Sequence, residues 1–202
     1  MEKGVHECIL YKPENNSVRC LACMQKCLIS EGKTGICGVR KNIGGKLFLL
    51  VYGKPCAVHV DPIEKKPLYN FLPKTFTFSI GTFGCNFRCM WCQNWDISQR
   101  SNLLSGVEEE IDGYNLSPKQ VIESAVENKC KSVAYTYNEP AIFIEYVYDC
   151  AKIAHERGLK NVLVTNGYFS KESFDFLMKE KLIDAANIDL KSFSDKTYKK
   201  YC

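Results

Sequence analysis

The stretch CNFRCMWC places three cysteines, Cys85, Cys89 and Cys92, within one short loop of the chain. Thiolates hold iron–sulfur clusters in proteins, and a cluster of four irons normally takes four of them. Three thiolates would leave one iron open, as a catalytic metal site keeps one position for an outside ligand. The CxxxCxxC spacing therefore predicts a 4Fe-4S cluster with an open iron. Zinc held by three cysteines and a histidine is the alternative, although no histidine lies near this loop in the sequence.

A second group of cysteines lies nearer the start of the chain, at Cys20, Cys23, Cys27 and Cys37. Four thiols are enough to close a tetrahedral zinc site or to ligate a conventional iron–sulfur cluster. They could instead be reduced thiols that pack a small subdomain. We favour a metal, because a small irregular segment gains much of its stability from such a staple. The sequence leaves open whether that metal is zinc or a second cluster.

The composition describes a globular chain of 202 residues, 46% of them hydrophobic, which suits one domain or one domain with a small appendage. The net charge is only +4 and the basic residues are scattered, so we expect no nucleic-acid partner. No apolar run approaches the roughly 20 residues of a membrane span, and the start of the chain has no signal-peptide core. We therefore expect a cytoplasmic protein without membrane association.

Twelve cysteines could suggest a secreted disulfide framework, but the chain is neither short nor preceded by a signal peptide. In a reducing compartment, clustered thiols serve metals or redox chemistry, and scattered thiols behave as small buried hydrophobes. We expect the second behaviour of the cysteines outside the two groups, namely Cys8, Cys56, Cys130, Cys150 and Cys202.

The chain divides into two parts. Residues 1–72 form an N-terminal cysteine-containing segment that is predicted to be small and irregular, with a hairpin-like stretch GGKLFLLVYGKP and an ordered loop DPIEKKPLYNFLP. The charges of DPIEKK indicate a solvated or helix-capping run, although a loop so near the next strand could cover a site. Residues 73–202 alternate strands with helices in about four units, with helix starts indicated at Ser117 and Ser170.

Strands separated by helices predict a parallel sheet, open or closed into a barrel. Ligands of such folds lie at the carboxyl ends of the strands. The cysteine loop follows the first strand, and polar pairs follow or end the next three strands: Asn138 and Glu139, Thr165 and Asn166, Asp189 and Lys191. Each pair alone could be a helix cap, a turn or a local ion pair. Their shared position at one rim predicts a single site.

With these residues the chain resembles the radical S-adenosylmethionine (SAM) enzymes, whose signature is CxxxCxxC after the first barrel strand. The resemblance implies that Cys85, Cys89 and Cys92 bind a 4Fe-4S cluster and that the open iron binds SAM. It also implies reductive cleavage of SAM to a 5′-deoxyadenosyl radical, which abstracts hydrogen from a substrate that the sequence does not identify. Trp91 matches the aromatic position that the family places against adenine, and its alternative is a core aromatic.

The stretch CNFRCMWCQN is similar to that of pyruvate formate-lyase activating enzymes. In that group a GGEP motif holds the methionyl amino group, which implies this role for Glu139 in the NEP of this chain. DLK, at Asp189 and Lys191, resembles a DxK motif that contacts the methionyl and ribose parts of SAM. The two motif glycines are replaced by Tyr137 and Asn138. Val164 stands where the activating enzymes carry a cation-binding aspartate, so no such cation is expected here.

Over nearly its whole length, from CLACMQKC to NIDLKSF, the chain is similar to the AmmeMemoRadiSam-system branch of these enzymes. The resemblance implies a partial TIM-type (β/α) barrel with a Cys-rich N-terminal segment. Because such barrels have about six strands, we expect this chain to be truncated at its C-terminal side, with Ile188 and Leu190 exposed at a sheet edge.

The expected partners are an electron donor such as flavodoxin or ferredoxin and, as one possible substrate, a protein. A glycyl-radical-enzyme activating enzyme of the pyruvate formate-lyase type is the alternative function. An iron–sulfur electron carrier or a zinc-stapled binding module is the second alternative, but neither needs the polar rim.

Overall fold

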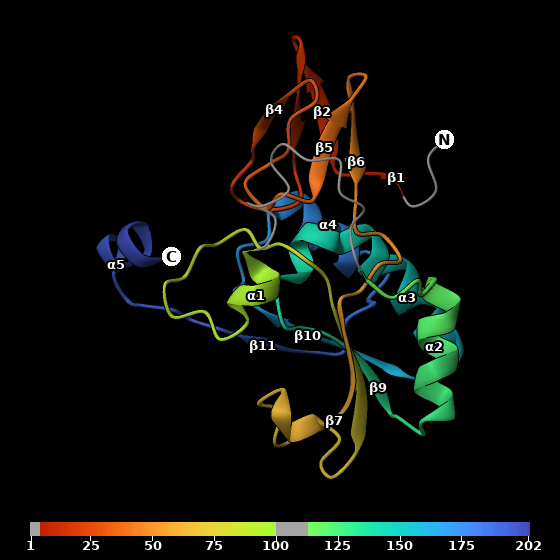
Figure 1. Ribbon diagram of the computed structural model, residues 1–202. Helices are drawn as coiled ribbons and strands as arrows, with labels where there is room; N and C mark the ends of the chain where they lie inside the picture. The colour runs from red at the N-terminus through yellow and green to blue at the C-terminus, as the bar shows by residue number, and fades with distance from the viewer. Residues whose placement is uncertain (1–4, 100–112) are drawn as a thin grey trace.

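A five-stranded sheet lies at the centre of the computed structural model, which describes residues 5–99 and 113–202 (Figure 1). Its strand order is β11-β10-β9-β8-β7. Parallel pairing confirms the predicted parallel sheet and joins β8 (Phe76–Gly81), β9 (Ser132–Tyr135), β10 (Lys160–Thr165) and β11 (Ala185–Ile188). The carboxyl ends of these strands therefore meet at one edge.

The helices begin and end where local chemistry allows. α2 (Pro118–Glu127) begins with Pro118 in its first turn and a capping box between Ser117 and Gln120, and α4 (Lys171–Met178) begins at Ser170, whose hydroxyl accepts from the Ser173 amide at 3.0 Å. The sequence predicted both starts. A 3₁₀ turn, η3 (Pro140–Phe143), precedes α3 (Ile144–Glu156), and Gly158 follows that helix with φ of 72°. Shorter helices are α1 (Trp95–Ser98) and α5 (Asp195–Tyr201).

The core lies between the sheet and the helices α2 and α3. Strand β9 is buried along its whole length, and α3 buries a face that includes Tyr146 and Val147. Both helices contact β9. Burial of this apolar surface is the main force that holds the helices on the sheet and fixes the loops that follow each strand.

The N-terminal part is more regular than the sequence predicted. It contains two antiparallel three-stranded sheets, which Figure 1 shows above the central sheet: β2 (Tyr11–Glu14), β3 (Ser17–Cys20) and β4 (Leu28–Ser30), and β1 (His6–Glu7), β6 (Lys46–Leu49) and β5 (Arg40–Ile43). The predicted hairpin-like stretch supplies the turn and one strand of a hairpin: Gly44 and Gly45, with φ of 62° and 76°, join β6 to β5, which lies before that stretch. Strands this short escape detection because cross-strand pairing, and not local periodicity, stabilises them.

The stretch DPIEKK does not lie in a loop throughout. Its first two residues end β7 (Ala57–Pro62), which pairs antiparallel with β8, and a 3₁₀ turn, η1 (Ile63–Lys65), follows. β7 belongs to the predicted segment 1–72 and yet extends the sheet of 73–202, so the two predicted parts share one sheet. Residues 1–4 and 100–112 lie outside the described residues, and the boundary between the two parts stays a prediction.

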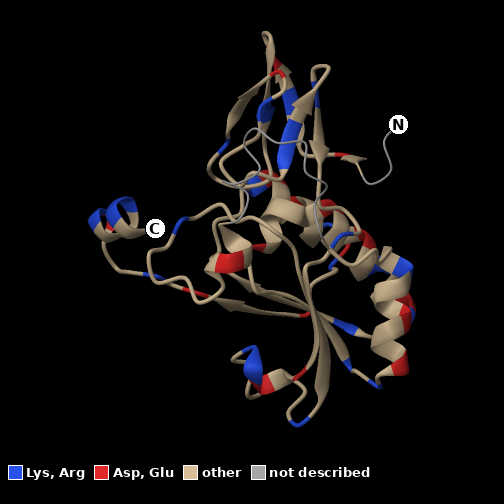
Figure 2. Ribbon diagram, viewed as in Figure 1, with Lys and Arg blue, Asp and Glu red and all other residues tan. Residues whose placement is uncertain are grey.

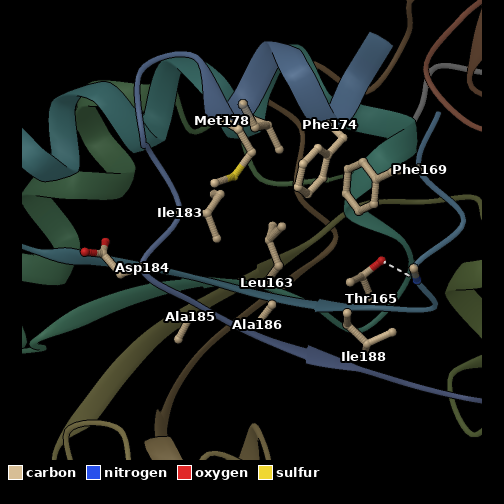
Figure 3. Close-up of a pocket in the computed structure, with 12 residues that line it drawn as sticks. Leu163, Thr165, Phe169, Phe174, Met178, Ile183, Asp184, Ala185, Ala186 and Ile188 are labelled. Carbon is tan, nitrogen blue, oxygen red and sulfur yellow. Dashed lines mark hydrogen bonds between the residues drawn. The ribbon is translucent and has the colours of Figure 1, made fainter. Parts of the chain in front are cut away.

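The sheet is open within the described residues, with β7 and β11 at its edges. Ile188 and Leu190 are exposed there, as expected. A mostly apolar cavity of about 350 Å³ lies between α4 and the strands β10 and β11, and Figure 3 shows Phe174 and Met178 above Leu163 and Ile188. The described part of the chain forms no closed barrel, and none of the described helices is long and apolar enough to cross a membrane.

Candidate functional site

A cavity of about 510 Å³ lies at the carboxyl ends of the parallel strands. It receives the three cysteines of the CxxxCxxC loop, together with Trp91, from the loop after β8. Segments after β9, β10 and β11 supply the rest of the wall, including Asn138, Thr165, Asn166, Asp189 and Lys191. The structure therefore brings together all four polar groupings that the sequence placed on one rim, although Glu139 itself does not line the cavity.

The cysteine loop is held by its own backbone and by α1. The Phe87 amide donates to Cys85 Sγ at 3.4 Å, and Cys92 Sγ lies 3.2 Å from Ser98 Oγ. Burial raises the pKa of Cys85 to about 12, and the nearby charge of Glu139 adds to the increase. Burial and a hydrogen bond with Cys202 raise the pKa of Cys89 to about 11, although Lys191 opposes this. Thiols in such a setting become thiolates only when a strong cationic partner binds them.

The donor set fits an iron–sulfur cluster better than a single ion. Among the described residues, no three His, Cys, Asp or Glu side chains converge closely enough to hold one metal ion. A cluster does not need this convergence, because each thiolate binds a different iron. Three thiols from one loop that share a cavity wall, with room beside them, are what a cluster with one open iron requires.

Cys202 is a further thiol at this loop that sequence reasoning missed. It was expected to be a small buried hydrophobe, yet it is half-buried and hydrogen-bonded with Cys89. The carbonyl groups of Tyr201 and Cys202 accept from the amides of Met90 and Arg88. A contact across more than a hundred residues leaves no local signal in the sequence. The other expectations hold for Cys8, Cys130 and Cys150, which are buried.

Asp189 and Lys191 form a pair at the end of β11. Lys191 Nζ donates to Asp189 Oδ2 at 2.8 Å, and the other carboxylate oxygen of Asp189 accepts from the Asn187 amide at 3.0 Å. Burial alone would lower the pKa of Lys191, but Asp189 and the nearby Cys89 and Cys85 raise it overall. The ammonium group therefore stays charged in the wall of the cavity that the three cysteines also line.

Glu139 lies beneath the rim and is fully buried. Its Oε1 accepts from Thr165 Oγ1 at 2.7 Å and from the Ala141 amide at 3.1 Å, and its Oε2 accepts from the Asn166 amide at 2.8 Å. Burial raises the pKa of Glu139 to about 7, although these hydrogen bonds oppose the increase. In this geometry the carboxylate organises the segment after β10 and has no face on the cavity.

Tyr137 and Asn138 replace the two glycines of the resembling motif. Tyr137 adopts φ of 71°, a conformation that favours glycine and that costs other residues on the order of 1–3 kcal/mol. Asn138 joins the ends of β8 and β9: its amide donates to Thr82 Oγ1 at 3.0 Å and to the Gly84 carbonyl at 2.9 Å. Asn138 therefore holds the start of the CxxxCxxC loop against the end of β9.

The DPIEKK charges form a solvated run only in part, because Asp61 and Lys66 are buried while Lys65 is exposed, and this corrects the interpretation from sequence. Asp61 and Lys66 are 4% and 2% exposed, and Lys66 Nζ donates to Asp61 Oδ2 at 2.7 Å. The Tyr137 hydroxyl donates to the same oxygen at 2.6 Å. Lys65 and Lys66 line the cavity, so this segment covers the site, as the second interpretation allowed. The burial depends on β7 pairing with β8, which the sequence did not indicate.

Comparison with known proteins gives the family. The Radical SAM superfamily pattern matches residues 79–202, which begin in β8 and include the cysteine loop. The chain belongs to the Radical SAM superfamily. Members of this superfamily are generally enzymes that use a 4Fe-4S cluster and SAM. The residues that line the cysteine-containing cavity lie in the matched region, apart from Lys65, Lys66 and Pro67.

Two curated relatives come from Methanocaldococcus jannaschii. One, named an uncharacterized protein, is 43% identical over 199 residues, which are 98% of this chain and 56% of that protein. The other, whose name gives it provisionally as a glycyl-radical enzyme activating enzyme, is 28% identical over 129 residues, which are 64% of this chain and 48% of that protein. The chain thus spans about half the length of the curated relatives it matches.

Charge does not single out another site. Figure 2 shows Lys and Arg spread over the N-terminal sheets, the segment after β7 and helix α5, with acidic residues between them. The apolar cavity of Figure 3 has few polar side chains in its wall, namely Thr165 and Asp184. The cysteine-lined cavity is the better candidate for chemistry, because ionisable and nucleophilic groups meet there.

Proposed function

We propose that this protein cleaves SAM reductively to start a radical reaction. The observation that carries the proposal is that the CxxxCxxC loop and the Asp189–Lys191 pair line one cavity. A bound 4Fe-4S cluster would supply one electron to the sulfonium of SAM, giving methionine and a 5′-deoxyadenosyl radical that takes hydrogen from the substrate.

The residues of the chain have separate tasks in this proposal. Cys85, Cys89 and Cys92 hold the cluster, and the charged Lys191 offers a partner for the carboxylate of SAM. Asp189 offers an acceptor for an amino or hydroxyl group. Trp91 lines the cavity with about half of its surface exposed, so its ring is available to stack on adenine.

Glu139 takes an indirect role in this proposal. The resembling motif assigns its counterpart to the methionyl amino group, but the carboxylate here is buried and already accepts three hydrogen bonds. We therefore treat Glu139 as a positioning residue that sets Thr165 and Asn166 at the cavity wall. Direct contact with SAM would require these bonds to be exchanged.

Activation of a glycyl-radical enzyme is the second candidate function. Its support is the partial similarity to the relative with that provisional name. A protein substrate and an electron donor such as flavodoxin or ferredoxin would then be the partners. Membership of the AmmeMemoRadiSam-system branch and a partial TIM-type barrel are parts of the same proposal, as is a cytoplasmic location.

The test is anaerobic reconstitution with iron and sulfide, followed by addition of SAM and a low-potential reductant. We expect the spectrum of the reduced cluster to change on addition of SAM, and 5′-deoxyadenosine to form. An electron carrier would take up iron without responding to SAM, and a zinc-stapled module would take up no cluster. Incubation with a deuterated candidate substrate, followed by mass spectrometry of 5′-deoxyadenosine, identifies the hydrogen donor.

A further inference from the structure

The four N-terminal cysteines lie around one small enclosed space. Cys20 ends β3, Cys23 and Cys27 lie in the connection to β4, and Cys37 precedes β5. All four line a single cavity, together with Arg40 and Ile142. Cys20, Cys23 and Cys37 are buried. Four thiols, the first and last of them seventeen positions apart in the sequence, thus line one space. The Radical SAM match begins at residue 79, so it does not include these cysteines.

Arg40 brings a buried hydrogen-bond donor without a partner to this cavity. Its side chain is 1% exposed, its Nε donates to the Ile142 carbonyl at 2.8 Å, and its Nη2 pairs with Glu145. Its Nη1 is buried and has no hydrogen-bond partner. A buried cationic donor without a partner is costly, which indicates that an anionic acceptor completes the site. A metal centre with four thiolate ligands is such an acceptor.

The spacing of the thiols distinguishes a cluster from zinc. The thiolates of a zinc site all bond one ion at roughly 2.3 Å and therefore stand close together. In the described part of the chain, no three ligand side chains converge in this way. A four-iron cluster takes one thiolate at each iron, so it suits thiols that surround a space without converging.

We propose that Cys20, Cys23, Cys27 and Cys37 bind a second, fully ligated 4Fe-4S cluster, with Arg40 as a donor to it. Four thiolates leave no iron open, so this cluster does not bind SAM. Hydrogen bonds and charge tune the potential of such clusters, and Arg40 is placed to do so.

The second site lies directly against the CxxxCxxC loop. Fully buried Asn86, next to Cys85, lies beside Cys23: burial raises the pKa of Cys23 to about 12, and the Asn86 side chain opposes the increase. Gln25 Nε2 donates to the Asn86 carbonyl at 2.8 Å. An added Cβ at Gly84 would stand 2.4 Å from the Cys37 carbonyl oxygen. The two cysteine groups are therefore neighbours in the fold.

The experiment counts iron and sulfide after anaerobic reconstitution of two combined variants. One replaces Cys85, Cys89 and Cys92 with Ala, and the other replaces Cys20, Cys23, Cys27 and Cys37 with Ser. The unchanged chain should hold about eight irons and eight sulfides, and each variant about half of that. Mössbauer spectra should assign the remaining iron to four-iron clusters. Only the second variant should respond to SAM.

The first variant decides the proposal even if the second fails to fold, because it keeps the N-terminal cysteines intact. Loss of all cluster iron in it, or stoichiometric zinc in place of iron, would overturn the proposal. Failure of the proposed function would show differently, as iron at the second site with none at the first. Cys8→Ala is the matched control: Cys8 is buried near Arg40 but does not line the cavity, and its variant should keep both clusters.

Discussion

The side-chain amide of Asn166 donates a hydrogen bond to Asn86 Oδ1 at 2.7 Å. Asn166 follows β10, and Asn86 stands inside the CxxxCxxC loop after β8, so this contact joins two loops across the strand that lies between them. The backbone amide of Asn166 donates to Glu139 Oε2. One buried carboxylate thus reaches the cysteine loop through a single intermediate residue.

We expect replacement of Cys85, Cys89 or Cys92 by Ala to abolish the SAM-responsive cluster. Each thiolate holds one iron, and a lost ligand leaves that corner without a bond to the protein. Iron and sulfide analysis with electron paramagnetic resonance measures the effect. Cys130→Ala, which changes a buried cysteine outside the cavity, should keep the signal. A full SAM-responsive signal in all three site variants would disprove the assignment.

Lys191→Met should leave the cluster intact and weaken SAM binding. The change removes a charged hydrogen-bond donor from the cavity, a loss on the order of 1.5–3 kcal/mol, or about 10-fold to 150-fold in affinity. A titration followed by the change in the cluster spectrum measures it. Lys171→Met removes an exposed lysine on α4 and serves as the control. Equal affinity in the two variants would mean that Lys191 does not contact SAM.

Glu139 should make stability depend on pH. Because burial raises its pKa from 4.5 to about 7, the folded protein holds the proton more tightly than the unfolded chain. Its contribution is fully present below pH 4.5 and is lost as pH rises through about 7, by on the order of 3 kcal/mol. Glu139→Gln should flatten this part of the curve of unfolding free energy against pH. A curve unchanged by the substitution would show that another group titrates there.

Asp61→Asn should destabilise the protein by about 3 kcal/mol, because it leaves the buried Lys66 without its charge partner. Lys65→Ala is the matched control: Lys65 contacts the same carboxylate but is 63% exposed, so its loss should cost less than about 1 kcal/mol. Denaturant unfolding measures both. Equal costs in the two variants would contradict the view that burial makes the Lys66 contact the important one.

Asp61 should also make stability depend on pH. Hydrogen bonds from Lys65, Lys66 and Tyr137 outweigh burial and lower the pKa of Asp61. The stabilisation by the Asp61 carboxylate is present above pH 3.8 and is lost as pH falls.

The sequence predicted best what local chemistry decides. The helix starts at Ser117 and Ser170 follow from residue type and spacing within a few positions. The position of the polar groups at one rim followed from the rule that parallel strands share their carboxyl edge.

Features that depend on distant pairing were missed. β7 is a strand because β8 lies beside it, and its own pattern of exposure shows no alternation. The burial of Asp61 and Lys66 follows from that pairing. Glu139 was assigned from a motif, but its burial depends on Thr165 and Asn166, which come from another strand. The contact of Cys202 with Cys89 spans more than half the chain.

Tyr137 shows two requirements competing at one position. Glycine would relax the backbone at φ of 71°, but glycine has no hydroxyl to reach Asp61 and no ring to lie under the Lys66 ammonium, 4.6 Å from its centre. The tyrosine helps to hold Asp61 and Lys66 in place at the cavity wall, at the expense of a relaxed main chain. A chain with glycine there would gain an adaptable loop and lose both contacts, so this one residue trades freedom of the backbone for a fixed arrangement of charged side chains.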